Sequence, residues 1–218
     1  MKKNYPVLTI AFLIIAFSAC KKDDVKSREN VLYETQFSSD DGRWSLDGLP
    51  GVTLSMNNGY YNIQSSLASN GLDTYLSGNV FTTGQKNAAA EISLKVNRYQ
   101  TTENYGAGLI WSKSGGGNTR IIYYFVISPL GGYRIYGYPN GTNNAEVVYA
   151  NWTINSIASP GNFNKLRVEL KNGQYHFVLN GREVYNMQAG NGATLDVMGL
   201  AAWAGVDVQV DYFKAITF

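Results

Sequence analysis

Residues 164–185 read NKLRVELKNGQYHFVLNGREVY, and this stretch is the strongest indication of fold class in the chain. Apolar and polar residues alternate in it: Leu166, Val168 and Leu170 fall on one side, with charged residues between them. A period of two is that of a β-strand. Asn172-Gly173 and Asn180-Gly181 suit the positive φ angles of two-residue type I′ turns. The stretch therefore predicts a three-stranded antiparallel meander with one buried and one polar face.

The rest of the chain carries the same signals. Further Asn-Gly pairs occur at positions 58–59, 70–71, 140–141 and 191–192, and Ile92, Leu94 and Val96 alternate with polar residues. Helical periodicity never persists beyond a turn or two after the N-terminal segment. Residues 31–218 contain no second linker, and 188 residues suit one all-β domain. We expect a single antiparallel two-sheet sandwich over residues 31–218.

The N-terminus resembles a lipoprotein signal peptide. Lys2-Lys3 precede an apolar run from Val7 to Phe17, and Phe17-Ser18-Ala19-Cys20 has the form of a lipobox. The run is too short for a membrane-spanning helix, which needs about 20 residues. We therefore expect a signal peptide over residues 1–19, lipidation of Cys20, and a polar tether over residues 20–30. Two or more acyl chains would hold the protein at a membrane stably.

The segment after the cysteine indicates where in the cell the protein is located. Lys21-Lys22-Asp23-Asp24 resembles the export signal of Bacteroidota-type surface lipoproteins. This resemblance implies an outer-membrane, lipid-anchored protein exposed at the cell surface. The alternative is a solvated start of the linker with no targeting role.

Charge and cysteine content exclude several classes of function. The formal net charge of +2 comes from 18 basic and 16 acidic residues, and removal of Lys2 and Lys3 leaves a neutral mature chain. Its basic residues are scattered, which argues against a nucleic-acid partner and against a polybasic membrane patch. Cys20 is the only cysteine, so the mature domain must be stable without a disulfide.

Three segments resemble the concanavalin A-like jelly rolls, the superfamily of lectins and glucanases. They are residues 162–169, residues 173–184, and the closing strands from Gly199-Leu200-Ala201 to Val210-Asp211-Tyr212-Phe213. The 3-keto-disaccharide hydrolase and laminin G-like domains share this layout. The resemblance covers most of residues 31–218 and implies a jelly-roll sandwich. It says little about activity, because the matching positions are structural.

The resemblance also argues against one reaction. Family 16 glycoside hydrolases of this superfamily carry an E-x-D-x-x-E motif on a central strand. The corresponding strand, residues 120–128, has no carboxylate, and no Asp or Glu occurs between Glu103 and Glu146. Glycoside hydrolysis needs two carboxyl groups across the scissile bond. We assign no catalytic residue, and a hydrolase using Glu91, Glu103 and Glu146 stays an alternative.

Other candidate sites are weaker. The single histidine, His176, falls on the polar face of its strand, where a solvated role is expected. Jelly rolls of this class sometimes hold a structural Ca²⁺, for which Asp40-Asp41 and the pair Asp207 and Asp211 are the local acidic groupings. The alternative for Asp40 and Asp41 is a turn role. We expect no cofactor, and the metal question stays open.

Aromatic residues carry the leading functional prediction. Alternation puts Tyr133 and Ile135 on one face of a strand, and Arg134, Tyr136 and Tyr138 on the other. Flat aromatic rings beside a guanidinium suit sugars, whose C–H faces are apolar and whose hydroxyls need donors. We predict that Trp111, Arg134, Tyr136 and Tyr138 bind an oligo- or polysaccharide without catalysis. The alternatives are that these aromatics cover a sheet, or that the domain binds an envelope protein.

Overall fold

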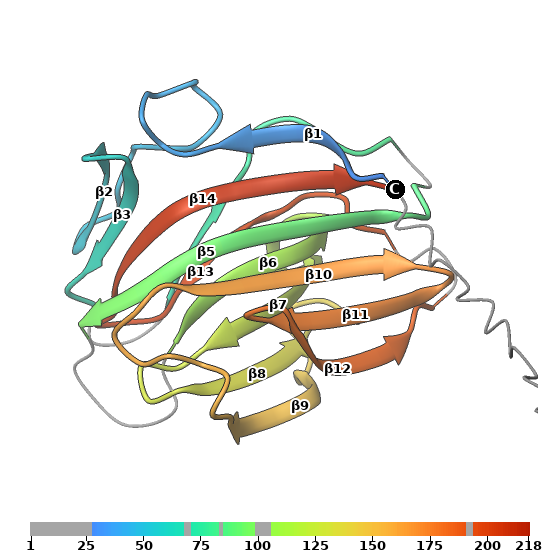
Figure 1. Ribbon diagram of the computed structural model, residues 1–218. Helices are drawn as coiled ribbons and strands as arrows, with labels where there is room; N and C mark the ends of the chain where they lie inside the picture. The colour runs from blue at the N-terminus through green and yellow to red at the C-terminus, as the bar shows by residue number, and fades with distance from the viewer. Residues whose placement is uncertain (1–27, 68–70, 83–84, 99–105, 191–193) are drawn as a thin grey trace, which may run out of the picture.

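The computed structural model describes residues 28–67, 71–82, 85–98, 106–190 and 194–218. The expected signal peptide, Cys20, most of the expected tether and Glu103 lie outside the described residues. In the described part of the chain, helical structure amounts to one 3₁₀ turn, Gly117–Thr119, and no helix has the length and apolarity of a membrane span. The described residues form two antiparallel sheets packed face to face (Figure 1). The expected antiparallel two-sheet sandwich is confirmed.

The larger sheet has eight strands in the order β12-β11-β10-β5-β14-β3-β2, and β1 pairs with the last part of β14. Its strands are β1 (Asn30–Thr35), β2 (Val52–Asn57), β3 (Tyr60–Ser65), β5 (Ala88–Arg98), β10 (Asn164–Lys171), β11 (Gln174–Leu179), β12 (Arg182–Gln188) and β14 (Asp207–Thr217). β14 pairs with β5 along almost its whole length and with β3 along its first residues. The last strand in sequence therefore lies inside the sheet.

The smaller sheet has six strands in the order β4-β13-β6-β7-β8-β9. They are β4 (Leu72–Tyr75), β6 (Ala107–Ser114), β7 (Ile121–Ile127), β8 (Gly132–Gly137), β9 (Val147–Ile154) and β13 (Gly199–Ala202). β13 inserts between β4 and β6, so segments distant in sequence meet on this sheet. It lies behind the larger sheet in Figure 1.

The predicted meander is present as β10, β11 and β12. Asn172 and Gly173 have φ angles of 52° and 74°, and Asn180 and Gly181 have 50° and 82°. Asn58-Gly59 joins β2 to β3 in the same way, with 52° and 76°. Positive φ at both central residues is the type I′ turn that matches the twist of the strands. Asn140-Gly141 differs: it lies in the longer connection from β8 to β9, and of the two only Gly141 has a positive φ.

The main core fills the space between the sheets. Ile92, Leu94 and Leu166 point inward from the larger sheet and are buried, as the alternation predicted. Leu109 and Phe125 meet them from the smaller sheet. Burial of apolar surface between the sheets supplies the stability that a domain without a disulfide needs.

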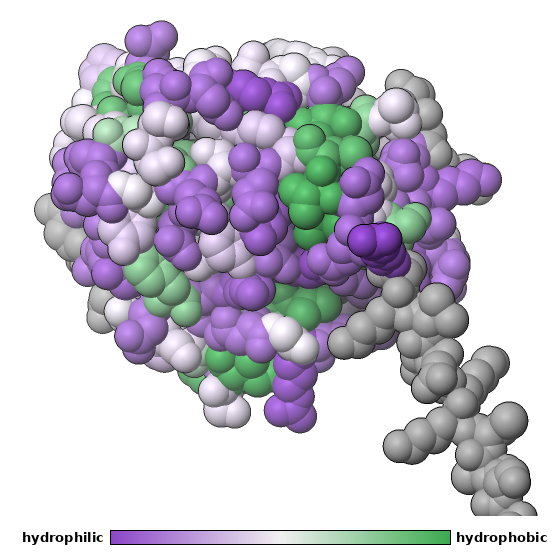
Figure 2. All heavy atoms as spheres, turned by 45° about the horizontal axis from the view of Figure 1, so that its top comes forward, coloured by the Kyte–Doolittle hydropathy of each residue, from purple (hydrophilic) through white to green (hydrophobic). Residues whose placement is uncertain are grey.

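The outer face of the larger sheet departs from the simple pattern at its centre. Glu91 falls on the predicted polar face of β5 but is only 8% exposed. Arg167 of β10 forms ion pairs with Glu91 at 3.2 Å and with Glu169 at 2.6 Å, and Tyr212 of β14 donates to Glu91 at 2.7 Å. The two neighbouring strands thus supply the groups that pair with this carboxylate and shield it from water. The side of the molecule in Figure 2 is mainly hydrophilic, with small separate hydrophobic groups.

The remaining weak candidates have local roles. His176 lies on the polar face of β11, and its Nδ1 is 2.8 Å from Glu183 on β12. The carboxylates of Asp40 and Asp41 accept hydrogen bonds from the backbone N–H two residues ahead, at 2.8 and 3.0 Å. This is the turn role that was the alternative to calcium. In the described part of the chain, no three His, Cys, Asp or Glu side chains gather as a metal site.

Candidate functional site

The outer face of the smaller sheet carries a second apolar cluster, separate from the main core. Its buried members are Ile110, Ile122, Tyr124, Val126, Tyr136 and Ala201. Tyr75, Tyr138, Trp152 and Trp203 pack against them with partial exposure. A sheet face turned to solvent is usually polar, so an aromatic-rich outer face distinguishes this sheet from its partner.

Strand register explains why this face is hollowed. Ala201 of β13 pairs with Asp73 of β4 on one side and with Gly108 of β6 on the other. Small residues therefore form the floor between the larger side chains of the neighbouring strands. The result is a cleft of about 300 Å³, called here the outer cleft. It is lined by Gly71, Asp73, Arg120, Tyr124, Tyr136, Tyr138, Thr142, Ala201, Ala202 and Trp203.

Asp73 is the polar centre of the outer cleft. Its Oδ2 accepts hydrogen bonds from the hydroxyls of Tyr124 at 3.0 Å and Tyr75 at 3.2 Å. Arg120 approaches the same oxygen at 3.7 Å and donates to the Tyr75 hydroxyl at 3.3 Å. Burial raises the pKa of Asp73, and the Tyr124 hydrogen bond and the charge of Arg120 oppose that rise. The carboxyl group is thus held by three side chains in a site largely removed from water.

Two guanidinium groups on the outer face of the smaller sheet have a buried donor without a partner among the described residues, and one of them, Arg120, lines the outer cleft. Arg134 is paired with Glu146 and lies 4.6 Å above the ring of Tyr136. The Nε atoms of Arg120 and Arg134 are buried and have no acceptor among the described residues. A buried donor without a partner costs about 1–3 kcal/mol. A ligand oxygen that reached these atoms would recover that cost.

The aromatic rings of the outer face pack on Tyr136, next to Arg134. Tyr136 stacks on Tyr124 with ring centroids 4.8 Å apart and is only 2% exposed. The ring of Tyr138 packs edge-on against that of Tyr136, with ring centroids 6.4 Å apart, and the Trp203 ring lies 6.2 Å from the Tyr136 ring. Tyr138 and Trp203 are partly exposed, so they offer ring surface to a ligand while Tyr136 supports them.

The structure brings together three of the four residues predicted to bind a ligand. Arg134, Tyr136 and Tyr138 share the outer face, whereas Trp111 points the other way. Trp111 is 1% exposed in the main core, where it packs on Tyr175 with ring centroids 4.6 Å apart. It therefore lines no part of the outer cleft. The predicted groove containing Trp111 beside Tyr136 is not formed.

Sequence reasoning missed Asp73, Arg120, Tyr124 and Trp203. Alternation within Leu72-Asp73-Thr74-Tyr75 places Asp73 on the outer face, but the strand is too short to stand out. The pairing of β13 with β4 is what joins Asp73 to the aromatic face, and it spans more than a hundred residues of sequence. No local pattern contains that pairing.

Of the carboxylates named for a hydrolase, the two that the structure describes do not share one site. Glu91 lies on the outer face of the larger sheet, and Glu146 pairs with Arg134 on the smaller sheet. Glu103 lies outside the described residues. Asp73 lines the outer cleft, and Glu146 pairs with Arg134, which lies above the ring of Tyr136, so both carboxylates lie near the outer cleft. β7, at the centre of this face, has no carboxylate.

Comparisons with known proteins concern the fold. No protein-family model and no curated protein matches the chain. Among solved structures, the metal-free carbohydrate recognition domain of Emp46p matches with a TM-score of 0.62 at 11% identity, over 86% of this chain and 97% of that one. The laminarinase catalytic domain from Thermotoga petrophila gives 0.60 at 10% identity, over 87% and 98%. Carbohydrate-binding module CBM66 from Bacillus subtilis gives 0.54 at 13% identity, over 78% and 94%.

Identities this low show a shared fold and nothing finer. The described residues share the jelly-roll sandwich fold of these structures, as the resemblance in the sequence implied. On this fold, the chain carries an aromatic outer cleft around a half-buried aspartate.

Proposed function

We propose that the protein is a non-catalytic carbohydrate-binding module whose outer cleft holds a short segment of a glycan. The observation that carries this proposal is that two partly exposed rings, Tyr138 and Trp203, line the same cleft as Arg120, whose buried Nε has no acceptor among the described residues. Aromatic faces accept the apolar C–H faces of sugar rings, and the Arg120 guanidinium can donate to sugar hydroxyls. A cleft of about 300 Å³ is at the small end of ligand sites.

The similar structures support this proposal without deciding it. Two are named as a carbohydrate recognition domain and a carbohydrate-binding module, and they share the fold of this chain. We also propose where the protein is located. Lipidation of Cys20 would anchor the domain in the outer membrane, and the Lys-Lys-Asp-Asp segment would direct it to the cell surface. A surface module with an open cleft would then meet polysaccharides outside the cell.

A glycan array with the full-length lipoprotein tests the proposal. The detergent must lack a sugar head group, because a maltoside would compete for the site. We expect binding to at least one oligosaccharide, weakened tenfold or more by Tyr138→Ala or Trp203→Ala. Tyr60→Ala is the matched control, because Tyr60 is a partly exposed tyrosine on the larger sheet. Absence of binding across the array, or equal binding by all variants, would reject the proposal.

A hydrolase is the second candidate, and Asp73 favours it. A carboxyl group with a raised pKa is the form that a general acid requires, and Glu146 is a second carboxylate beside the same tyrosines. Incubation with the glycans that bind, followed by detection of new reducing ends, tests it. Release that disappears in Asp73→Asn and in Glu146→Gln would make the protein an enzyme. Binding without release supports the module.

A further inference from the structure

A second cavity, called here the end cavity, opens between the two sheets where β6 ends and β7 begins. Its volume is about 390 Å³. Trp111 and Tyr123 line it from the smaller sheet, and Tyr175 and Met187 line it from the larger one. Among the described residues, the end cavity and the outer cleft have no lining residue in common. The two are separate features of the sandwich.

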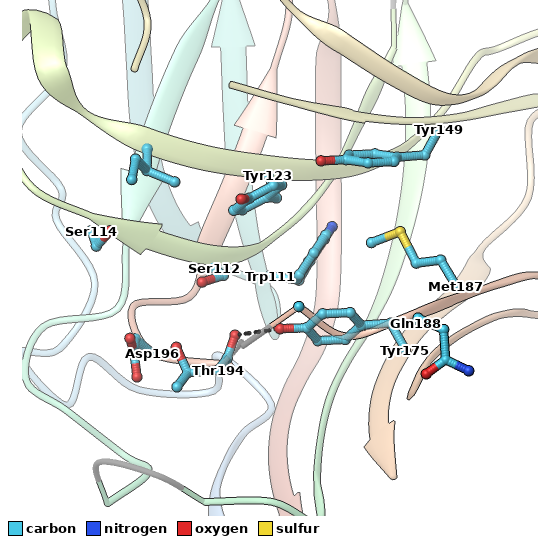
Figure 3. A pocket seen from close by; sticks show the side chains of 12 residues that line it. Trp111, Ser112, Ser114, Tyr123, Tyr149, Tyr175, Met187, Gln188, Thr194 and Asp196 are labelled. Atoms are coloured by element: carbon cyan, nitrogen blue, oxygen red, sulfur yellow. Dashed lines mark hydrogen bonds between the residues drawn. The ribbon is translucent and has the colours of Figure 1, made fainter. Parts of the chain in front are cut away.

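Aromatic rings form the walls of the end cavity. Tyr123 stacks on Trp111 with centroids 4.8 Å apart, and Tyr149 lies 6.3 Å from Tyr123. Figure 3 shows Trp111 between Tyr149 and Tyr175, with its ring nitrogen at the end of the indole nearer Tyr149. The Tyr175 hydroxyl donates to the backbone carbonyl of Thr194 at 3.1 Å, which fixes the lower ring.

The indole nitrogen of Trp111 is an unused donor. It is buried, and it has no hydrogen-bond acceptor among the described residues. Desolvating an N–H group without a partner costs about 1–3 kcal/mol. Most buried polar groups in proteins do have partners, so an exception on the wall of a cavity indicates an acceptor supplied from outside.

The charges around the end cavity select the kind of ligand. Asp196 is the only charged residue among the described lining residues, so an anion would be repelled. Burial raises the pKa of Tyr149 to about 12 and also raises those of Tyr123 and Tyr175, so all three hydroxyls are neutral at physiological pH. The Tyr175 hydrogen is already donated to Thr194, so it is the hydroxyls of Tyr123 and Tyr149 that can donate to a ligand. Ser112 adds a further hydroxyl group. The walls therefore combine ring faces, neutral hydroxyls and one carboxylate acceptor.

We infer that the end cavity is a second binding site, one that takes a single neutral sugar residue such as the end of a glycan chain. The sugar ring would lie against the rings of Tyr123 and Tyr149. One oxygen of the sugar would accept a hydrogen bond from the Trp111 nitrogen, and the hydroxyls of the sugar would donate to Asp196. A neutral sugar offers an acceptor, several donors and apolar C–H faces within a volume that a cavity of this size admits. The inference does not depend on binding at the outer cleft.

Titration of the full-length lipoprotein with single sugars tests the inference. The probes are glucose, galactose, mannose, N-acetylglucosamine and N-acetylgalactosamine, with glucuronic acid as the anionic comparison, in a detergent without a sugar head group. Saturation-transfer NMR detects weak binding, and calorimetry gives the affinity. We expect at least one neutral sugar to bind and glucuronic acid to bind at least tenfold more weakly than that sugar.

Three variants locate the binding. Tyr149→Ala removes a ring from the wall, Asp196→Asn removes the charge while keeping the shape, and Trp111→Phe removes the N–H while keeping an aromatic ring. Each should weaken the neutral sugar at least fivefold, and Tyr60→Ala should leave it unchanged. Circular dichroism of each variant identifies any that fails to fold, and Asp196→Asn is the mildest of the three.

The outcomes separate this site from the outer cleft. Binding that Tyr138→Ala abolishes and the Tyr149 and Asp196 variants leave unchanged would belong to the outer cleft and would overturn the inference. Absence of binding by every neutral sugar would overturn it as well. Loss of neutral-sugar binding in the end-cavity variants, with binding retained in Tyr138→Ala, would support the inference even if no oligosaccharide bound the outer cleft.

Discussion

At the scale of single residues, Asp73 shows how a carboxyl group becomes the centre of a site. Two tyrosine hydroxyls donate to one of its oxygens, and Arg120 lies close to the same atom. These contacts stabilise the ionised form, yet burial has the larger effect and raises the pKa. The protonation state of Asp73 therefore couples to folding.

The substitution Asp73→Asn should change the pH dependence of stability. The pKa of Asp73 is raised in the folded protein, so folding favours the protonated form. The stabilising contribution of Asp73 is full below its unfolded pKa of about 4 and is lost as pH rises through the raised folded pKa. The free energy of unfolding of the wild type, relative to Asp73→Asn, should fall as pH rises. Urea unfolding of both proteins from pH 3 to pH 8 measures this difference, and a rising difference would contradict the prediction.

On the larger sheet, Arg167 is likewise a charged side chain held by several partners. Its guanidinium contacts Glu29, Glu91 and Glu169, and Glu91 is buried beside it. Arg167→Met would leave the Glu91 carboxylate without its main cation, so it should lower the free energy of unfolding by about 3 kcal/mol. Chemical denaturation measures the loss. The double variant Arg167→Met, Glu91→Gln should recover part of it, and no recovery would mean that the ion pair is not the cause.

At the scale of elements, the two hairpins of the meander use one turn type in different ways. Asn172 and Asn180 occupy the same position of a type I′ turn. The side chain of Asn180 also accepts from the backbone N–H of Lys165 at 2.7 Å and donates to the carbonyl of Ile157 at 2.7 Å. No comparable bonds are formed by the exposed side chain of Asn172 with the described residues.

Glycine substitutions should separate these two roles. Glycine keeps the positive φ angle, so only the side-chain bonds are lost. Asn180→Gly should lower the free energy of unfolding by about 2 kcal/mol, because two or more hydrogen bonds disappear. Asn172→Gly should change it by less than about 0.5 kcal/mol. Thermal and urea unfolding compare the variants, and equal effects would show that the turn geometry alone matters.

The strands could be predicted because alternation is local, whereas much of the site could not. Leu166, Ile92 and Tyr136 lie on the faces that the alternation assigned. The sequence of the strand that holds Trp111 does not indicate which of its faces points to solvent, so Trp111 was placed on the same face as Tyr136. A register shift between Ile110 and Ser112 adds to the ambiguity. The burial of Glu91 depends on Arg167, which a separate strand supplies.

At the scale of the whole molecule, the fold places two aromatic sites on different parts of one sandwich. The outer cleft lies on the exposed face of the smaller sheet, and the end cavity opens between the sheets. A long glycan could contact the cleft along its chain while a chain end enters the cavity. Two weak sites on one rigid domain raise the overall affinity when both are engaged.

The proposed lipid anchor gives a prediction at the same scale. Cys20→Ser removes the residue that would carry the acyl chains, so the protein should move from the membrane fraction to the soluble fraction. Cell fractionation with an antibody against the domain measures the shift. Replacement of Lys21-Lys22-Asp23-Asp24 by alanines should leave the protein in membranes but protect it from protease added to intact cells. Membrane retention of Cys20→Ser would disprove lipidation as the anchor.

The position of β14 inside the larger sheet has a consequence for secretion. β14 pairs with β5, β3 and β1, strands that the ribosome completes more than a hundred residues earlier. The larger sheet therefore cannot close during synthesis until residue 217 has been made, because three of its strands await one partner. The topology therefore delays closure of this sheet until synthesis is almost complete. If the protein is exported as proposed, an export channel that threads unfolded chains would receive it in that state.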